Sequence, residues 1–375
     1  MQDKKSVLAQ KLKDKNPADI KMVIGFDGFV DEIIHPVDKR LDHVRFTRIE
    51  TISQLARRIE KASGLSTNIE LVPVAKKIGG NGPIMCNALA RHGAKITYIG
   101  ALGVPAIDEV FRMPANVTLH SIANNGHTDA LEFLDGKLLL GKMTSLNDVT
   151  YEKLIAVLGK DNLVQLLGEA DLFASVNWSM LPAMTELWQK LLDEILPLLP
   201  IRAKKPIFFV DIADPEKRQA AEIIGALDLL KSFSTRFFVV LGLNKKEAYD
   251  VAKILGLFPA EALEKMQTTL RDVTEALDRR IGVDALVVHP VDRSATVVSG
   301  IYAEAMGPFC AKPKLTTGAG DNFNAGYVLG LLLGLDPEEA LLTGMATSGY
   351  YVRNATSPDF RELTAFIEAW ANGTI

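Results

Sequence analysis

The sequence predicts an α/β fold of three layers, in which helices cover both faces of a mostly parallel central sheet that carries a small β lid. After residue 147, short apolar runs typical of buried strands alternate with helical patterns. Such alternation produces parallel strands joined by right-handed crossovers. The 375 residues, 48% of them hydrophobic, suffice for one large sheet of this kind, so we expect a single domain over 1–375.

The N-terminal third shows strand and helix patterns in turn. Ile20–Gly25 is an apolar run that predicts a buried strand, and Ala94–Gly100 predicts another. Two further segments, about 33–49 and 117–143, contain short strand patterns, with a hairpin signal at Asp135-Gly136. We expect these two segments to form the lid. Further predicted elements are helices at Lys5–Leu12 and Thr51–Ser63 and a strand at Ile69–Ile78.

The rest of the chain predicts the remaining strands of the sheet and a helical end. Predicted strands are Asp171–Val176, Pro206–Asp211, Arg236–Leu241, Val283–His289 and Thr296–Val298. After Asp321 the pattern is helical to the end.

Composition excludes several classes of function. The formal net charge of −4 gives no reason to expect nucleic acid or a membrane surface as a partner. Cys86 and Cys310 lie in apolar surroundings, which indicates a reducing compartment and no disulfide framework. The N-terminus lacks the apolar region of a signal peptide, and no apolar run reaches transmembrane length. We therefore expect a cytoplasmic protein.

The stretch L-T-T-G-A-G-D-N-F-N-A-G-Y, Leu315–Tyr327, carries the strongest chemical signal. Glycines at the start of a helix let backbone N–H groups approach an anion, and the helix dipole favours negative charge there. Asp321 follows in the first helical turn, where a carboxylate can act as a base. The alternative is an aspartate that only stabilises a helix N-terminus.

T-T-G-A-G-D before a helix of small and aromatic residues resembles the C-terminal signature of the ribokinase/PfkB family of carbohydrate kinases. G-G-N-G-P-I-M-C-N-A-L-A-R-H-G, residues 79–93, is similar to the other signature of that family, and N-K-K-E, residues 244–247, matches its N-x-x-E. The resemblance extends from Ile20 to about Phe366. It implies a ribokinase-like fold and transfer of the γ-phosphoryl group of ATP, with Mg²⁺, to a hydroxyl of a sugar or related polyol.

The resemblance also assigns residues to the site. Asp321 becomes the base, and Gly318, Ala319 and Gly320 form the anion hole. The acceptor would lie on Asp31, which matches the family's V-D-x-I best, with Asp27 as the alternative aspartate. The other residues assigned are Gly79, Gly80 and Asn81 for the acceptor, Asn244 and Thr317 for the nucleotide, and Glu247 for Mg²⁺ through water. Asn244 and Glu247 also fit a capping box, and the two interpretations are compatible.

Three positions depart from the family pattern. Leu315 stands where many members have an aspartate that helps to hold a monovalent cation, so K⁺ activation is doubtful. H-P-V-D-R-S, residues 289–294, replaces T-x-G-x-x-G, and we assign His289 no chemical role. Ile84 stands where the family usually has Asn.

Several alternatives stay open. Within the same fold they are a nucleoside kinase and an ADP-dependent sugar kinase, and outside catalysis a nucleotide- or sugar-binding regulatory protein. Apolar edge strands in the lid favour a homodimer formed through it.

Overall fold

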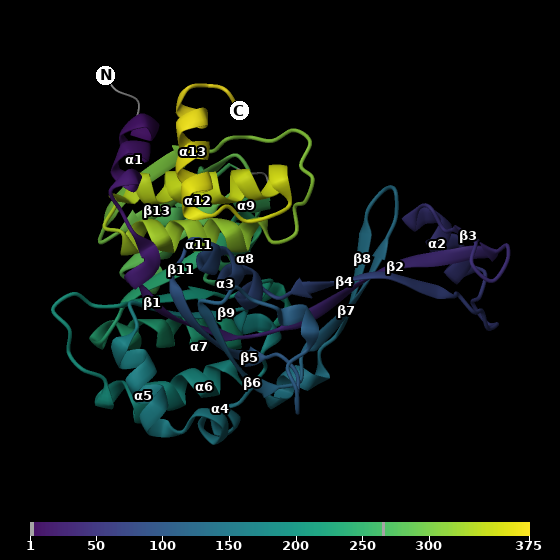
Figure 1. Cartoon of the computed structure of the whole chain (residues 1–375), viewed down its shortest axis with the longest axis horizontal. Helices are drawn as coiled ribbons and strands as arrows, with labels where there is room; N and C mark the ends of the chain where they lie inside the picture. The colour runs from purple at the N-terminus through teal and green to yellow at the C-terminus, as the bar shows by residue number, and fades with distance from the viewer. Residues whose placement is uncertain (1–3, 265–266) are drawn as a thin grey trace.

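The computed structural model describes residues 4–264 and 267–375, and its centre is a nine-stranded sheet with helices on both faces (Figure 1). The strands are β1 (Lys21–Phe26), β5 (Lys95–Ala101), β6 (Val117–Ala123), β9 (Leu172–Val176), β10 (Ile207–Asp211), β11 (Phe238–Asn244), β12 (Ala285–His289), β13 (Arg293–Val298) and β14 (Ile301–Met306). Their order across the sheet is β14-β13-β12-β11-β10-β9-β1-β5-β6. The strands from β12 to β6 are parallel, whereas β13 and β14 are antiparallel. The predicted three-layer α/β fold is confirmed.

Two apolar cores lie on opposite faces of this sheet. Strand side chains alternate between them, so that Phe208 belongs to the core that contains Leu227 of one helical layer, while Phe209 belongs to the core that contains Val328 of the other. One layer contains α1 (Lys4–Lys13), α3 (Asn81–Arg91), α11 (Ala319–Leu332), α12 (Pro337–Asn354) and α13 (Phe360–Ala371). The other contains α4 (Tyr151–Leu158), α5 (Lys160–Glu169), α6 (Met184–Lys190), α7 (Ala220–Leu230), α8 (Lys245–Ile254), α9 (Ala260–Glu264) and α10 (Leu270–Ile281). In the part of the chain that the structure describes, no helix is both long and apolar enough to cross a membrane.

A second, five-stranded sheet extends from the body as an arm (Figure 1). Its strands are β2 (Phe29–Arg40), β3 (Phe46–Arg48), β4 (Leu71–Gly79), β7 (Gly126–Glu132) and β8 (Lys137–Lys142). A small apolar cluster, with α2 (Ile52–Glu60) against it, gives the arm a core of its own; its buried members are Ile34, Ile49, Leu55, Leu131 and Phe133. We call this sheet together with α2 the lid.

The lid differs from the expected segments in two ways. The segment 117–143 was expected to lie wholly in the lid, but β6 pairs in parallel with β5 and belongs to the edge of the central sheet. Conversely, β4 pairs with β2 along most of its length and belongs to the lid. The prediction was wrong for β6 because an isolated strand pattern does not reveal which sheet supplies the neighbouring strand.

Candidate active site

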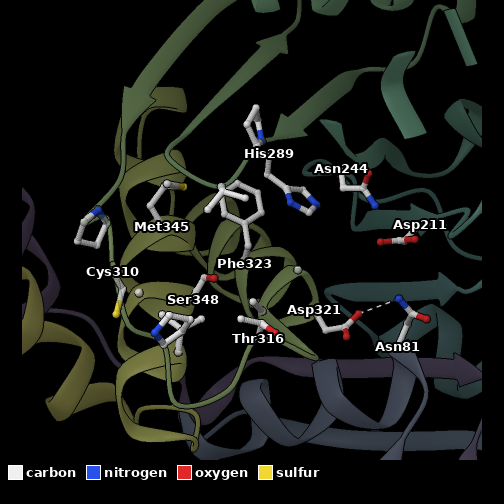
Figure 2. A pocket seen from close by; sticks show the side chains of 18 of the residues that line it. Asn81, Asp211, Asn244, His289, Cys310, Thr316, Asp321, Phe323, Met345 and Ser348 are labelled. Atoms are coloured by element: carbon white, nitrogen blue, oxygen red, sulfur yellow. Dashed lines mark hydrogen bonds between the residues drawn. The ribbon is translucent and has the colours of Figure 1, made fainter. Parts of the chain in front are cut away.

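The site lies where the parallel strands end. Asp211, Asn244 and His289 are the last residues of β10, β11 and β12, and α11 begins opposite them (Figure 2). Together with Asn81, Glu247 and Asp321 they line a cavity of about 430 Å³. Crevices at the carboxyl ends of such strands are where α/β proteins bind ligands. The remaining wall is mostly apolar; it includes Pro290, Val291, Pro308, Cys310, Pro313, Met345 and Val352.

The start of α11 is held in a fixed shape. Gly318, its N-cap, has φ 88°, in the left-handed region that favours glycine. A Cβ atom there would lie 3.0 Å from the Tyr351 hydroxyl, which itself donates a hydrogen bond to the Thr317 carbonyl (2.8 Å). Asn322 Nδ2 donates to the Gly318 carbonyl (2.9 Å). The loop is therefore braced from two sides.

This geometry refines the predicted anion hole. The Ala319 N–H already donates to the Thr316 carbonyl (3.1 Å), whereas Gly320 follows in the first helical turn, where N–H groups have no acceptor within the helix. Ala319 and Gly320 both line the cavity, but of the two threonines it is Thr316, not the expected Thr317, that does so. Thr317 contributes its carbonyl to the brace instead.

Asp321 lies in that first turn with its carboxylate at the cavity wall (Figure 2). Its side chain is only 8% exposed, and its Oδ1 accepts a hydrogen bond from Asn81 Nδ2 (2.9 Å). Burial, and then the negative charges of Asp211 and Asp27, hold the pKa of Asp321 well above its usual range. A carboxylate with raised proton affinity at the edge of a cavity suits a general base.

The two candidate acceptor aspartates have different environments. Asp27 is fully buried and accepts hydrogen bonds from the backbone N–H groups of Asn81 and Gly82 (both 2.9 Å) and from Asn177 Nδ2 (2.7 Å). Burial raises the pKa of Asp27 to about 6, although these hydrogen bonds act to lower it. Asp27 thus caps the start of α3 from another part of the chain.

Asp31 lies four residues further along the chain, on β2. It is half-buried, it shares a hydrogen bond with Thr128 of β7, and burial raises its pKa. A Cβ atom on Gly79 would lie 2.6 Å from the Asp31 carboxylate, and one on Gly80 would lie 2.7 Å from Asp27 Oδ2. The Gly79-Gly80 turn therefore leaves space for both carboxylates, and Asp31 retains the more open position.

Asn244 and Glu247 form the expected capping box. Glu247 Oε2 accepts from the Asn244 N–H (2.8 Å), and Asn244 Oδ1 accepts from the Glu247 N–H (3.0 Å). Yet the Glu247 side chain also lines the cavity and is almost fully buried. Burial, and then the charge of Asp211, raise the pKa of Glu247 well above its usual range. The capping interpretation is confirmed, and a role toward a metal remains compatible with it.

Asp211 is a member of the site that sequence reasoning missed. Its oxygens accept from the Ala213 N–H and from Asn324 Nδ2 (both 2.8 Å), and burial raises its pKa to about 6. Asn324 Oδ1 is buried with no partner in the described part of the chain. Asp211 ends the apolar run of β10, so the rule that α/β proteins bind ligands at the carboxyl ends of their strands would have found it. Buried carboxylates that repel one another are the environment that a divalent cation and its waters relieve, so these residues fit Mg²⁺.

The family of this chain follows from its similarity to known proteins. A family model described as prokaryotic ketohexokinase (Khk) matches residues 4–370. A ketohexokinase of Haloferax volcanii is 26% identical over 352 residues, which cover 93% of this chain and 91% of that protein.

Among solved structures, the ribokinase of Thermotoga maritima superposes with a TM-score of 0.59 at 16% identity and covers 94% of this chain and 99% of its own. The Arabidopsis thaliana ribokinase complexed with ribose and ATP gives 0.62 at 15% identity, with the same coverage of 94% and 99%. A mutant of phosphofructokinase-2 from Escherichia coli gives 0.62 at 13%, with coverage of 95% and 99%. These similarities show the shared fold. The chain thus belongs to the prokaryotic ketohexokinase family, has the ribokinase fold and is an ATP-dependent carbohydrate kinase.

Proposed function

We propose that this kinase phosphorylates a hydroxyl of a ketohexose, with Asp321 as the base. The observation that carries the assignment is the position of Asp321: it lies in the first turn of α11, at the wall of the cavity, with its carboxylate bonded to Asn81. Asn81 in turn bonds through its backbone to Asp27. The base therefore lies between the nucleotide cavity and the Gly79-Gly80 turn that faces Asp31.

In the proposed mechanism the acceptor hydroxyl points at Asp321, which takes its proton as the oxygen attacks the γ-phosphorus of ATP. The bond from that phosphorus to the bridging oxygen breaks, and ADP leaves with the electron pair. Asp31 and Asn81 position the sugar, whose hydroxyls suit carboxylate and amide partners. The N–H groups at the start of α11, with Gly320 in the first turn, stabilise negative charge on the transferring phosphoryl group. Mg²⁺, held through water by Glu247 and Asp211, would neutralise the phosphate oxygens. Asn244 at the start of α8 and Thr316 would contact the nucleotide.

The lid completes the acceptor site in this proposal. Asp31 belongs to β2 and Thr128 to β7, so both are part of the lid. Among the residues that the structure describes, no strand pairs with the outer edge of β8, and Leu139 and Leu140 on this strand are 62% and 50% exposed. We propose that a second copy of the chain covers this edge. We expect light scattering to give a dimer for the wild type and a monomer for Leu139→Lys. A monomeric wild type would contradict the proposed second copy.

The test of the function is a phosphorylation panel followed by ³¹P NMR. It offers four ketohexoses, four aldohexoses and two nucleosides, each with ATP-Mg²⁺ and with ADP-Mg²⁺. We expect turnover with ATP and at least one ketohexose in preference to the aldohexoses and nucleosides. Asp321→Asn is the control that separates this enzyme from contaminating kinases. Preference for a nucleoside, or for an aldohexose, would overturn the substrate assignment.

A further inference from the structure

His289 is a partly buried polar residue in the wall of the cavity, and the mechanism has not used it. It ends β12 directly beside Asn244 of β11, with which it is paired in the sheet register. Its Nε2 is buried and has no hydrogen-bond partner among the residues that the structure describes. Leaving such a donor or acceptor unsatisfied is destabilising, so its persistence at a ligand cavity requires an explanation.

An unpartnered histidine alone would not point to a ligand. His92 is also buried, and both of its ring nitrogens lack partners in the described ranges, yet it packs beside Phe360 and does not line the cavity. His289 differs because its ring forms part of the cavity wall. A Cβ atom on Gly320 would lie 3.3 Å from His289 Cε1, the carbon between the two ring nitrogens. The nitrogen-bearing edge of the imidazole thus lies against the start of α11.

The orientation of this ring is fixed by packing. It stacks on Phe323 with a centroid distance of 4.6 Å and an angle of 29° between planes. Phe323 stacks in turn on Tyr327, whose hydroxyl is hydrogen-bonded to that of Thr296 (2.7 Å). Figure 2 shows the imidazole on the side of the cavity that holds Asn244 and Asp211, opposite the apolar wall at Cys310. The ring therefore faces the polar half of the cavity, where phosphates would lie.

We propose that His289 donates a hydrogen bond from Nε2 to the phosphate chain of the bound nucleotide. This inference rests on the nucleotide site proposed above. It supplies a donor in a segment where H-P-V-D-R-S has neither the threonine nor the glycines of the related kinases. A metal-ligand role fits less well, because within the described chain the one cluster of three potential ligand side chains lies in the lid, at Glu32, His127 and Asp129.

The protonation state of the ring decides whether Nε2 can donate. Burial lowers the pKa of His289 to about 4, so the free enzyme holds a neutral imidazole with one N–H donor and one acceptor nitrogen. Donation from Nε2 requires the proton on that nitrogen, as in the Nε2–H tautomer or in the imidazolium. Negative phosphate oxygens beside the ring favour its protonated form, so nucleotide binding should raise this pKa.

The experiment measures dissociation constants by calorimetry and imidazole nitrogen shifts by NMR. His289→Phe keeps a ring against Phe323 but removes the donor, and we expect a Kd for ATP-Mg²⁺ about 10- to 100-fold higher, as for a hydrogen bond to a charged group. His289→Asn, which offers an amide donor, should lose less. Adenosine has no phosphate and should bind wild type and His289→Phe equally. His92→Phe is the matched control and should leave every Kd unchanged.

The chain has six histidines, so the His289 signal can be assigned by its loss in the Phe variant. In wild type, addition of a non-hydrolysable ATP analogue should shift Nε2 of His289 and leave His92 in place. A Kd for ATP within twofold of wild type in His289→Phe, or a shift produced by Mg²⁺ alone, would overturn the inference. If His289→Phe does not fold, the wild-type titration decides. Absence of ATP binding by wild type would overturn the proposed function itself.

Discussion

Replacing Asp321 by Asn tests the catalytic assignment most directly. The amide keeps the size of the side chain and an oxygen that can accept from Asn81 Nδ2, now 2.9 Å from Asp321 Oδ1, but it cannot take a proton as a carboxylate does. General base catalysis is typically worth about 10²–10⁴ in rate. We therefore expect kcat to fall by about that factor, or roughly 3–5 kcal/mol of barrier. The Kd for ATP should change less than about threefold, because Asn still suits the start of a helix.

The stability of this variant has a defined sign. Because the pKa of Asp321 is raised, the folded protein binds this proton more tightly than the unfolded chain does. Stability from this group is therefore greatest below the usual aspartate pKa and declines as pH rises toward the raised value. Asn has no such dependence. At pH 8 the Tm of Asp321→Asn should equal or exceed that of wild type.

The assay combines a pH–rate profile with thermal unfolding. Wild-type kcat should rise with pH through the raised pKa of Asp321, and the kcat of the variant should show no such rise. Asp31→Asn is the matched control; it should raise KM for the sugar and change kcat less. Near wild-type turnover by Asp321→Asn refutes the reasoning. So does a loss of activity that follows a lowered Tm, because Asp321 would then be needed for folding and not as a base.

Four further predictions concern the metal, the monovalent cation, the glycine turn and the lid. Glu247→Gln should raise the Mg²⁺ concentration needed for half-maximal rate with little change in Tm, because Gln also completes a capping box; unchanged metal dependence would leave only the cap. Replacing Na⁺ by K⁺ should change the rate less than about twofold, since Leu315 offers no oxygen ligand, and a large rise would show that other groups bind the ion. Gly79→Ala places a Cβ atom 2.6 Å from the Asp31 carboxylate, so KM for the sugar should rise about tenfold while the Kd for ATP stays constant; an unchanged KM would remove Asp31 from the acceptor site. Hydrogen exchange of β2, β4 and β7 should slow when sugar binds, and equal protection with and without sugar contradicts closure of the lid.

The central fold was predictable because its signals are local. Each buried parallel strand is a short apolar run, and each covering helix carries its own apolar spacing, so alternation alone gives the layers. Strand partners were not predictable in this way. β6 pairs with β5, and β4 pairs with β2. The residues of β6 and β4 show no pattern that indicates these partners.

The site shows the same division between local and distant information. Asp321 and the glycines before it are adjacent in sequence, so their joint meaning could be read directly. The function of Asp27 as a cap could not, because its donors come from residues 81, 82 and 177. His289 was assigned no role for a similar reason: its significance depends on a cavity formed by distant segments.

The junction between β4 and α3 bears on how much ATP the enzyme loses to hydrolysis. Only Gly80 separates the last residue of this lid strand from Asn81, the residue that holds the base. We therefore expect movement of the lid to be transmitted over this single residue to the hydrogen bond between Asn81 and Asp321. We expect the lid, when closed on a sugar, to keep the base aligned during the reaction, so that water rarely takes the phosphoryl group. One inserted residue after Gly80 should loosen this linkage and produce an enzyme that hydrolyses ATP wastefully when sugar is absent.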